Sequence, residues 1–327
     1  MGDRVRIYEV GPRDGLQNEA TTIPLETKLG FIERLAAAGL REIEATSFVS
    51  RKAIPQLADA DELLAKLTRG PGGGAERPAG IRYPVLVPNE RGMARAEAAG
   101  ADALAVFTAA SDAFTERNIG MTIEASLAAF APVLRRAADL GWWRRGYVST
   151  AFGCPYTGAV DPHRAVAVAL RLLELGVDEV CFGDTIGVGV PAQVAVLTGA
   201  AVQAGIPLDR IAYHFHDTRG TALANVSAGL DAGVRCFDSS TGGTGGCPYA
   251  PGAAGNLATE DLVYLLSASG YEHGVLLDGV LEAARFITTA LDKPLTSKVG
   301  QAGGWDAMTG AATGAATGAA TGGAISR

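Results

Sequence analysis

The feature that most constrains the fold of this chain is a short apolar run followed by an alanine-rich amphipathic stretch, repeated eight times. The apolar runs, each typical of a β-strand, are 5–10, 42–45, 83–87, 103–107, 146–150, 179–182, 211–215 and 236–238. Helical patterns follow at 25–38, 56–67, 91–99, 123–140, 162–175, 192–204 and 221–232, with two more at 259–267 and 279–291. Such alternation predicts an α/β fold of the (β/α)₈ TIM barrel type.

A doubly wound open sheet is the alternative fold. No GxGxxG pattern follows the first strand, so nothing favours a dinucleotide-binding sheet. We expect one catalytic barrel domain over residues 1–303 and a tail over 304–327. The tail repeats TGAA and cannot build a core, so we expect it to be disordered. A glycine-rich stretch at 69–80 is typical of a flexible surface insertion.

Charge and composition exclude several classes of protein. The formal net charge is −7 and no basic run is long enough to follow a nucleic-acid backbone, so we expect no nucleic-acid partner. Apolar stretches are interrupted well short of about 18 residues, which predicts no membrane span. The first strand is expected almost at once, so we expect no targeting peptide. The four cysteines show no paired spacing, which suggests a reducing cytoplasm. A homo-oligomer is possible, but no interface stripe is evident.

Two histidines close together on one strand are the first candidate for a functional site. In a TIM barrel the reacting residues lie at the carboxyl ends of the strands. His214 and His216 are separated by one residue at such an end, so both imidazoles face the same way. They suit a divalent cation, and the alternative is a pair of packing histidines.

Oxygen ligands for a cation are available nearby. Asp14 closes the first strand and Asn256 follows the last, and these two strands are neighbours in a closed barrel. Two nitrogens with hard oxygens fit Mg²⁺ or Mn²⁺ acting as a Lewis acid, and they do not exclude Zn²⁺.

Other charged residues follow the strand ends. Arg13 either forms an ion pair in the barrel mouth or presents a fixed positive charge to a developing oxyanion. Glu44 lies in an otherwise apolar strand and needs a buried partner, for which Arg13 is the expected residue. Asp184 also ends an apolar strand, where it would hold a hydroxyl or an arginine.

The glycine-rich loop at 236–256 contains Cys247. So much glycine suits a loop that moves or lets a ligand approach closely, and the alternative is a floppy surface loop. Gly-Cys-Pro-Tyr occurs twice, at 153–156 and 246–249. Cys247 is the better candidate for a reactive thiol, because its loop could close over a site and exclude water.

Together these residues resemble the 3-hydroxy-3-methylglutaryl-CoA lyase family from about residue 5 to 302. The matching segments are VGPRDGLQNE (10–19), EATSFVS (44–50), RGYVSTAFGCPY (145–156), FGDTIGVG (182–189), HFHDTRGTALAN (214–225) and GGCPYAPGAAGNLATEDLVYLL (245–266). The combination of RDGLQNE, HxHD and GGCPY…GN is highly specific.

The resemblance implies a metal-dependent retro-Claisen lyase that acts on an acyl-CoA in leucine or related breakdown. The metal ligands would be Asp14, His214, His216 and Asn256. Asp14 or His214 would take the proton of the 3-hydroxyl, Arg13 would hold the thioester oxygen, and Cys247 would protonate the enolate carbon. The supporting or substrate-binding residues would be Glu44, Gln17, Tyr147, Asp184 and Thr185.

The chain departs from the family at Ala20, Arg219 and the loop entry TGGTGGCP, where Thr241 and Thr244 could suit another 3-hydroxyacyl-CoA. Alternatives are therefore a lyase for another 3-hydroxy-3-alkylglutaryl-CoA, a Claisen-condensing synthase, or a barrel that only binds metal or acyl-CoA. The condensing relatives resemble GxGERxGN in the last loop, which this chain lacks.

Overall fold

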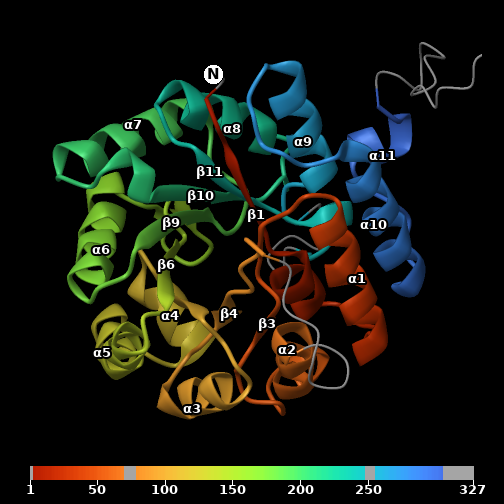
Figure 1. Ribbon diagram of the computed structural model, residues 1–327. Helices are drawn as coiled ribbons and strands as arrows, with labels where there is room; N and C mark the ends of the chain where they lie inside the picture. The colour runs from red at the N-terminus through yellow and green to blue at the C-terminus, as the bar shows by residue number, and fades with distance from the viewer. Residues whose placement is uncertain (1–2, 70–78, 247–254, 305–327) are drawn as a thin grey trace, which may run out of the picture.

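The computed structural model describes residues 3–69, 79–246 and 255–304, which form a ring of parallel strands surrounded by helices (Figure 1). The strands of the ring are β1 (Arg6–Glu9), β2 (Glu42–Ile43), β3 (Thr46–Ser47), β4 (Val85–Leu86), β5 (Ala103–Ala109), β6 (Trp143–Ser149), β9 (Glu179–Asp184), β10 (Ile211–Phe215) and β11 (Cys236–Ser239). The longer helices are α1 (Leu25–Ala37), α2 (Ala60–Arg69), α3 (Glu90–Ala98), α5 (Ile123–Asp139), α6 (Pro162–Glu174), α7 (Pro191–Gln203), α8 (Ala222–Asp231), α9 (Thr259–Ala268) and α10 (Leu277–Ala290).

The sheet closes on itself, which confirms the predicted TIM barrel. Its strand order is β2-β1-β11-β10-β9-β6-β5-β4-β3. The two ends of this order, β2 and β3, are pieces of one run at 42–47, so they belong to the same barrel strand. A bridge between Glu42 and Arg82 joins the β2 segment to the chain just before β4. The described ranges contain no helix with the length and hydropathy that a membrane span needs.

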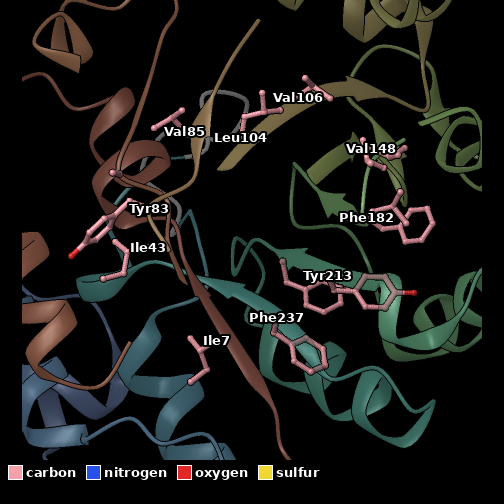
Figure 2. Close-up of a cluster of buried hydrophobic side chains, with 14 of the residues drawn as sticks. Ile7, Ile43, Tyr83, Val85, Leu104, Val106, Val148, Phe182, Tyr213 and Phe237 are labelled. Carbon is pink, nitrogen blue, oxygen red and sulfur yellow. The ribbon is translucent and has the colours of Figure 1, made fainter. Parts of the chain in front are cut away.

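Alternation along the strands separates two environments. Side chains such as Ile7, Val106, Phe182 and Phe237 point outward into the apolar layer beneath the helices (Figure 2). Because side chains alternate with period two, their neighbours point into the barrel. The inner set contains Tyr8 and Tyr147 and several charged groups that are paired with one another. The apolar layer therefore holds the fold together, while the interior of the barrel carries the polar residues.

Some elements lie outside the predicted pattern. The sequence DAFTERNI forms α4 (Asp112–Ile119), and a short hairpin pairs β7 (Gly153–Cys154) with β8 (Gly158–Ala159). A short helix, α11 (Lys298–Ala302), follows α10. Strand β6 begins at Trp143, earlier than predicted, and includes Arg145, which is fully buried among its ion-pair partners. The predicted tail after Gly304 and most of the insertion at 69–80 fall outside the described residues.

A candidate active site at the carboxyl end of the barrel

A cavity of about 460 Å³ opens at the carboxyl ends of the strands. Its polar lining contains many of the residues that the sequence singled out. The apolar part of its wall comes from β4, β5, α4 and the segment after β3. The predicted residues in this lining are Arg13, Asp14, Gln17, Tyr147, Thr185, His214 and His216. A cavity of this size, with a few convergent polar groups, is typical of a small-molecule site.

A one-turn π-helix, η1 (Gly11–Gly15), presents Arg13 and Asp14 to the cavity. The carbonyl of Val10 accepts from the amides of residues 13, 14 and 15, so the chain folds back tightly after β1. Gly15 allows this turn to lie against the loop after β11, because a Cβ there would come within 2.4 Å of Thr244 Oγ1. Single π turns of this kind occur frequently at functional sites.

The guanidinium of Arg13 is held in place by two carboxylates. Its Nε donates to Glu44 Oε1 at 2.6 Å and its Nη1 donates to Asp14 Oδ1 at 2.5 Å. The hydroxyl of Tyr147 donates to the other oxygen of Glu44 at 2.6 Å. Burial alone would lower the pKa of Arg13, but the charges of Glu44 and Asp14 outweigh it and raise the pKa. Arg13 is therefore a fixed positive charge at the cavity wall, paired with Glu44 as predicted.

Asp14, His214 and His216 converge on one point. One ligand atom from each lies within 4.8 Å of the other two. Burial alone would raise the pKa of Asp14, but the nearby Arg13 and His214 lower it to about 2, so the carboxylate is ionised at neutral pH. Burial, with His214 close by, lowers the pKa of His216 to about 3, so its imidazole is neutral and free to bind a cation.

Asn256 completes this group from the segment after β11. A backbone bridge pairs it with His216, and its Nδ2 donates to Asp14 Oδ2 at 2.9 Å. Its Oδ1 and the Nδ1 of His216 are buried, and neither has a hydrogen-bond partner among the described residues. Buried polar atoms rarely lack partners, and a carboxylate, two imidazoles and an amide oxygen are all donors to divalent ions. These four residues fit a divalent metal ion.

The orientation of His214 comes from a residue that the sequence analysis missed. Its Nδ1 lies 3.1 Å from Asp238 Oδ2, and Asp238 Oδ1 accepts from Arg145 Nη2 at 2.6 Å. Burial alone would lower the pKa of His214, but the hydrogen bond and charge of Asp238 raise it. A carboxylate behind an imidazole fixes the ring so that its other nitrogen faces the site. The signal was an aspartate inside the apolar strand CFDS and an arginine inside WRRGYVS.

The remaining predicted residues differ in how they relate to the cavity. Thr185 lines the cavity and its hydroxyl accepts from the amide of Thr150. Glu44 is fully buried behind Arg13 and does not line the cavity. Asp184 accepts from the amides of residues 188 and 189, and so shapes the loop after β9. Cys247 lies outside the described residues.

The two threonines at the loop entry do not line the cavity. Thr241 Oγ1 donates to the buried Glu9, and Thr244 Oγ1 hydrogen-bonds with Ser240. Both side chains therefore brace the start of the loop. Arg219 bonds the carbonyls of residues 186 and 187 with its Nη1 and likewise supports a loop.

Comparison with known proteins gives one family. A family model described as HMGL-like matches residues 4–287. The cytoplasmic 3-hydroxy-3-methylglutaryl-CoA lyase of Rattus norvegicus is 47% identical over 302 residues, which cover 92% of this chain and 85% of that protein. The hydroxymethylglutaryl-CoA lyase of Pseudomonas mevalonii is 47% identical over 298 residues, or 91% of this chain and 96% of that one. The crystal structure of the Pseudomonas aeruginosa hydroxymethylglutaryl-CoA lyase superposes with a TM-score of 0.87 at 44% identity, covering 92% of this chain and 98% of that one.

Proposed function

The chain belongs to the HMGL-like family, and from this membership we propose that it is a lyase that cleaves 3-hydroxy-3-methylglutaryl-CoA to acetoacetate and acetyl-CoA. The observation that carries the proposal within the structure is a cavity lined by Asp14, His214 and His216, with Asn256 bonded to Asp14, beside the fixed charge of Arg13. A cation site and a guanidinium can hold two oxygens of one substrate at the same time. A barrel that only binds an acyl-CoA needs no such pair.

The reaction removes a proton from the 3-hydroxyl, breaks the C2–C3 bond and moves its electron pair to the thioester as an enolate. We assign Mg²⁺ or Mn²⁺ to Asp14, His214, His216 and Asn256, where the ion would act as a Lewis acid that lowers the pKa of the hydroxyl. Asp14 and His214 are the two bases beside it that can accept the proton.

The enolate oxygen carries the negative charge after the bond breaks. Arg13 is ionised and immobilised by Glu44, so it can stabilise this charge without reorganising. The enolate carbon must then be protonated, or it would recombine with acetoacetate. We propose that Cys247 donates this proton, as the resemblance to the family implies. The adjacent Gly246 lines the cavity.

The proposal is tested by incubating the protein with 3-hydroxy-3-methylglutaryl-CoA and Mg²⁺ and measuring acetoacetate and acetyl-CoA. Equal amounts of both products should form, and a chelator should stop the reaction. Arg13→Gln should lower kcat by about 100-fold or more, since one oxyanion-stabilising group is lost. If only 3-hydroxy-3-alkyl analogues were cleaved, the named substrate would be wrong while the chemistry would stand.

In the cell, we propose that this reaction serves leucine breakdown in the cytoplasm. Two observations support the cytoplasm. The cysteines at 154, 181 and 236 are free thiols, as expected in a reducing compartment, and one relative is the cytoplasmic lyase of Rattus norvegicus. Within residues 3–69, 79–246 and 255–304, no feature favours the condensing direction over cleavage.

A further inference from the structure

A second and larger cavity, of about 650 Å³, lies at the opposite end of the barrel. Its wall comes from the amino ends of the strands, with residues from the start of β1, β2, β10 and β11. In TIM barrels this end does not carry the catalytic residues. The cavity is therefore separate from the candidate active site, and no step of the proposed reaction uses it.

The lining of this cavity carries more positive than negative side chains, although the whole chain is negatively charged. Five arginines line it, and only two carboxylates, Glu42 and Asp209, do so. The complete chain has a net charge of −7. A hollow lined by one sign of charge focuses the field and attracts ions of the opposite sign. The arginines are Arg4, Arg6, Arg41, Arg82 and Arg235.

Two of these arginines are preorganised by aromatic rings. The guanidinium of Arg82 lies 4.5 Å from the centre of the Trp143 ring, and that of Arg235 lies 5.6 Å from the centre of the Tyr271 ring. Among the described residues, Arg82 hydrogen-bonds only through Nη1, to Glu42, which leaves its Nε and Nη2 protons available. A stacked guanidinium loses little freedom when it binds a second group.

Two further arginines are exposed at the rim. Arg4 and Arg41 have no ion pair with any residue of the described ranges. Arg6, by contrast, is committed to Glu42 and Glu179 and forms the floor of the cavity. The rim therefore offers free guanidinium groups above a floor that is already neutralised.

We propose that this cavity binds a small organic polyphosphate such as a nucleoside di- or triphosphate. The phosphates would lie on Arg82, Arg41 and Arg4, because a guanidinium matches phosphate oxygens two at a time. The organic part would pack against the apolar wall that includes Ile81 and Leu208. Arg6 is already paired with Glu42 and Glu179, and Arg235 with Asp3, so the positive charge left for a ligand comes from Arg4, Arg41 and Arg82. Three guanidinium groups suit the oxygens of linked phosphates better than a single carboxylate.

The test is isothermal titration calorimetry on the full chain, with its metal loaded, free metal removed and CoA present to occupy the candidate active site. ATP and pyrophosphate should bind with micromolar to low-millimolar Kd, and the affinity should fall as salt increases. Adenosine, which lacks the phosphates, should not bind. Arg41→Gln and Arg82→Gln should each weaken ATP binding by about tenfold.

Arg171→Gln is the matched control, because Arg171 is exposed on α6 outside the barrel and the same charge is removed. It should leave the Kd for ATP unchanged. Pyrophosphate binding as tightly as ATP would identify the phosphate group alone as the ligand and keep the site. The proposal is overturned if the wild-type chain binds neither anion, if citrate binds as tightly as ATP, or if Arg171→Gln weakens binding as much as Arg41→Gln. Because the readout is binding and not turnover, failure of the proposed lyase activity would not affect it.

Discussion

At the scale of single residues, the buried Oδ1 of Asn256, which has no hydrogen-bond partner among the described residues, is the clearest indication of a cation site. It lies buried beside Asp14, to which the same amide donates through Nδ2. Burying such an acceptor without a partner costs about 1 to 3 kcal/mol, so the arrangement makes physical sense when a cation satisfies the oxygen. The same holds for Nδ1 of His216.

Asn256→Ala should therefore weaken Mn²⁺ binding by about tenfold or more, because it removes one oxygen ligand and the hydrogen bond that orients Asp14. Electron paramagnetic resonance of free Mn²⁺, without substrate, measures the Kd directly. Gln17→Ala is the control, since Gln17 lines the cavity and is not in the ligand set. Unchanged Mn²⁺ affinity in Asn256→Ala would refute this ligand.

Glu260 makes the stability of the fold depend on pH. It is fully buried on α9, and burial raises its pKa to about 7 although Ser297 and the amide of Gly242 donate to it. A carboxyl group with a raised folded-state pKa costs nothing below its ordinary pKa of 4.5. Its ionisation destabilises the fold as pH rises from about 4.5 through 7.

Glu260→Gln should remove this loss, because glutamine stays neutral and can accept from Gly242 while donating to Ser297. The variant should match the wild type near pH 4.5 and gain up to about 2 to 3 kcal/mol of unfolding free energy at pH 8. Urea unfolding at both pH values measures the difference. A gain of the same size at both would show that ionisation of Glu260 is not the cause.

At the scale of elements, the π-helix η1 and the loop after β11 meet at Gly15. A Cβ on Gly15 would come within 2.4 Å of Thr244 Oγ1 and 2.7 Å of Ser240 Oγ. Contacts under 3.0 Å force a shift, and Thr244 is itself buried and hydrogen-bonded to Ser240. The position of Arg13 and Asp14 thus depends on a close approach that only glycine allows.

Gly15→Ala should push η1 away from the loop, lower the Tm by several degrees and weaken Mn²⁺ binding, because Asp14 moves with the turn. Gly199→Ala is the control: Gly199 is inside α7 and a Cβ there meets nothing within 4 Å. That variant should be neutral or stabilised by up to about 1 kcal/mol. Equal melting and Mn²⁺ binding in both variants would contradict the packing argument.

The elements that could be predicted from the sequence are those whose apolar runs are continuous. Strand β10 matches its predicted bounds, Ile211–Phe215, because its hydrophobic signal is unbroken apart from His214. Helix α4 was missed because DAFTERNI has little apolar periodicity and is stabilised by its neighbours. The start of β6 was missed because arginine rarely lies in a buried strand, and only the tertiary pairing with Asp238 and Glu179 makes Arg145 tolerable there.

Some residues of the candidate site could be predicted from the sequence and others could not. His214 and His216 could be predicted from strand periodicity, and Asp14 and Asn256 from the neighbourhood of the first and last strands. Asp238 could not, because its function is to orient another side chain and depends on a contact across two strands. The position of Asp184 behind its loop likewise needs the backbone of residues 188 and 189.

At the scale of the whole molecule, a chain of alternating charges runs through the barrel from one cavity to the other. Its links include Arg82 to Glu42 at 2.6 Å, Glu42 to Arg6 at 3.2 Å, and Arg6 to Glu179. The interior of a TIM barrel is usually packed with branched apolar side chains, so buried charges here must satisfy one another. The full order is Arg82, Glu42, Arg6, Glu179, Arg145, Asp238 and His214.

Glu179 lies at the middle of this chain, between Arg6 and the fully buried Arg145. Glu179→Gln leaves the guanidinium of Arg145 with Asp238 as its remaining ion-pair partner among the described residues. Breaking a buried pair from one side costs about 3 to 5 kcal/mol, because the other charge stays buried. Urea unfolding at pH 7 should show a loss of this size.

Glu124→Gln is the matched control, because Glu124 pairs with Arg171 on the exposed outer surface and its loss should cost less than about 1 kcal/mol. High salt should weaken the surface pair and leave the pair of Glu179 with Arg145 nearly unchanged, since both of these side chains are buried away from dissolved ions. If Glu179→Gln cost no more than Glu124→Gln, the interior charges would be stabilised by something other than one another. The alternating chain of charges would then contribute little to the free energy of unfolding.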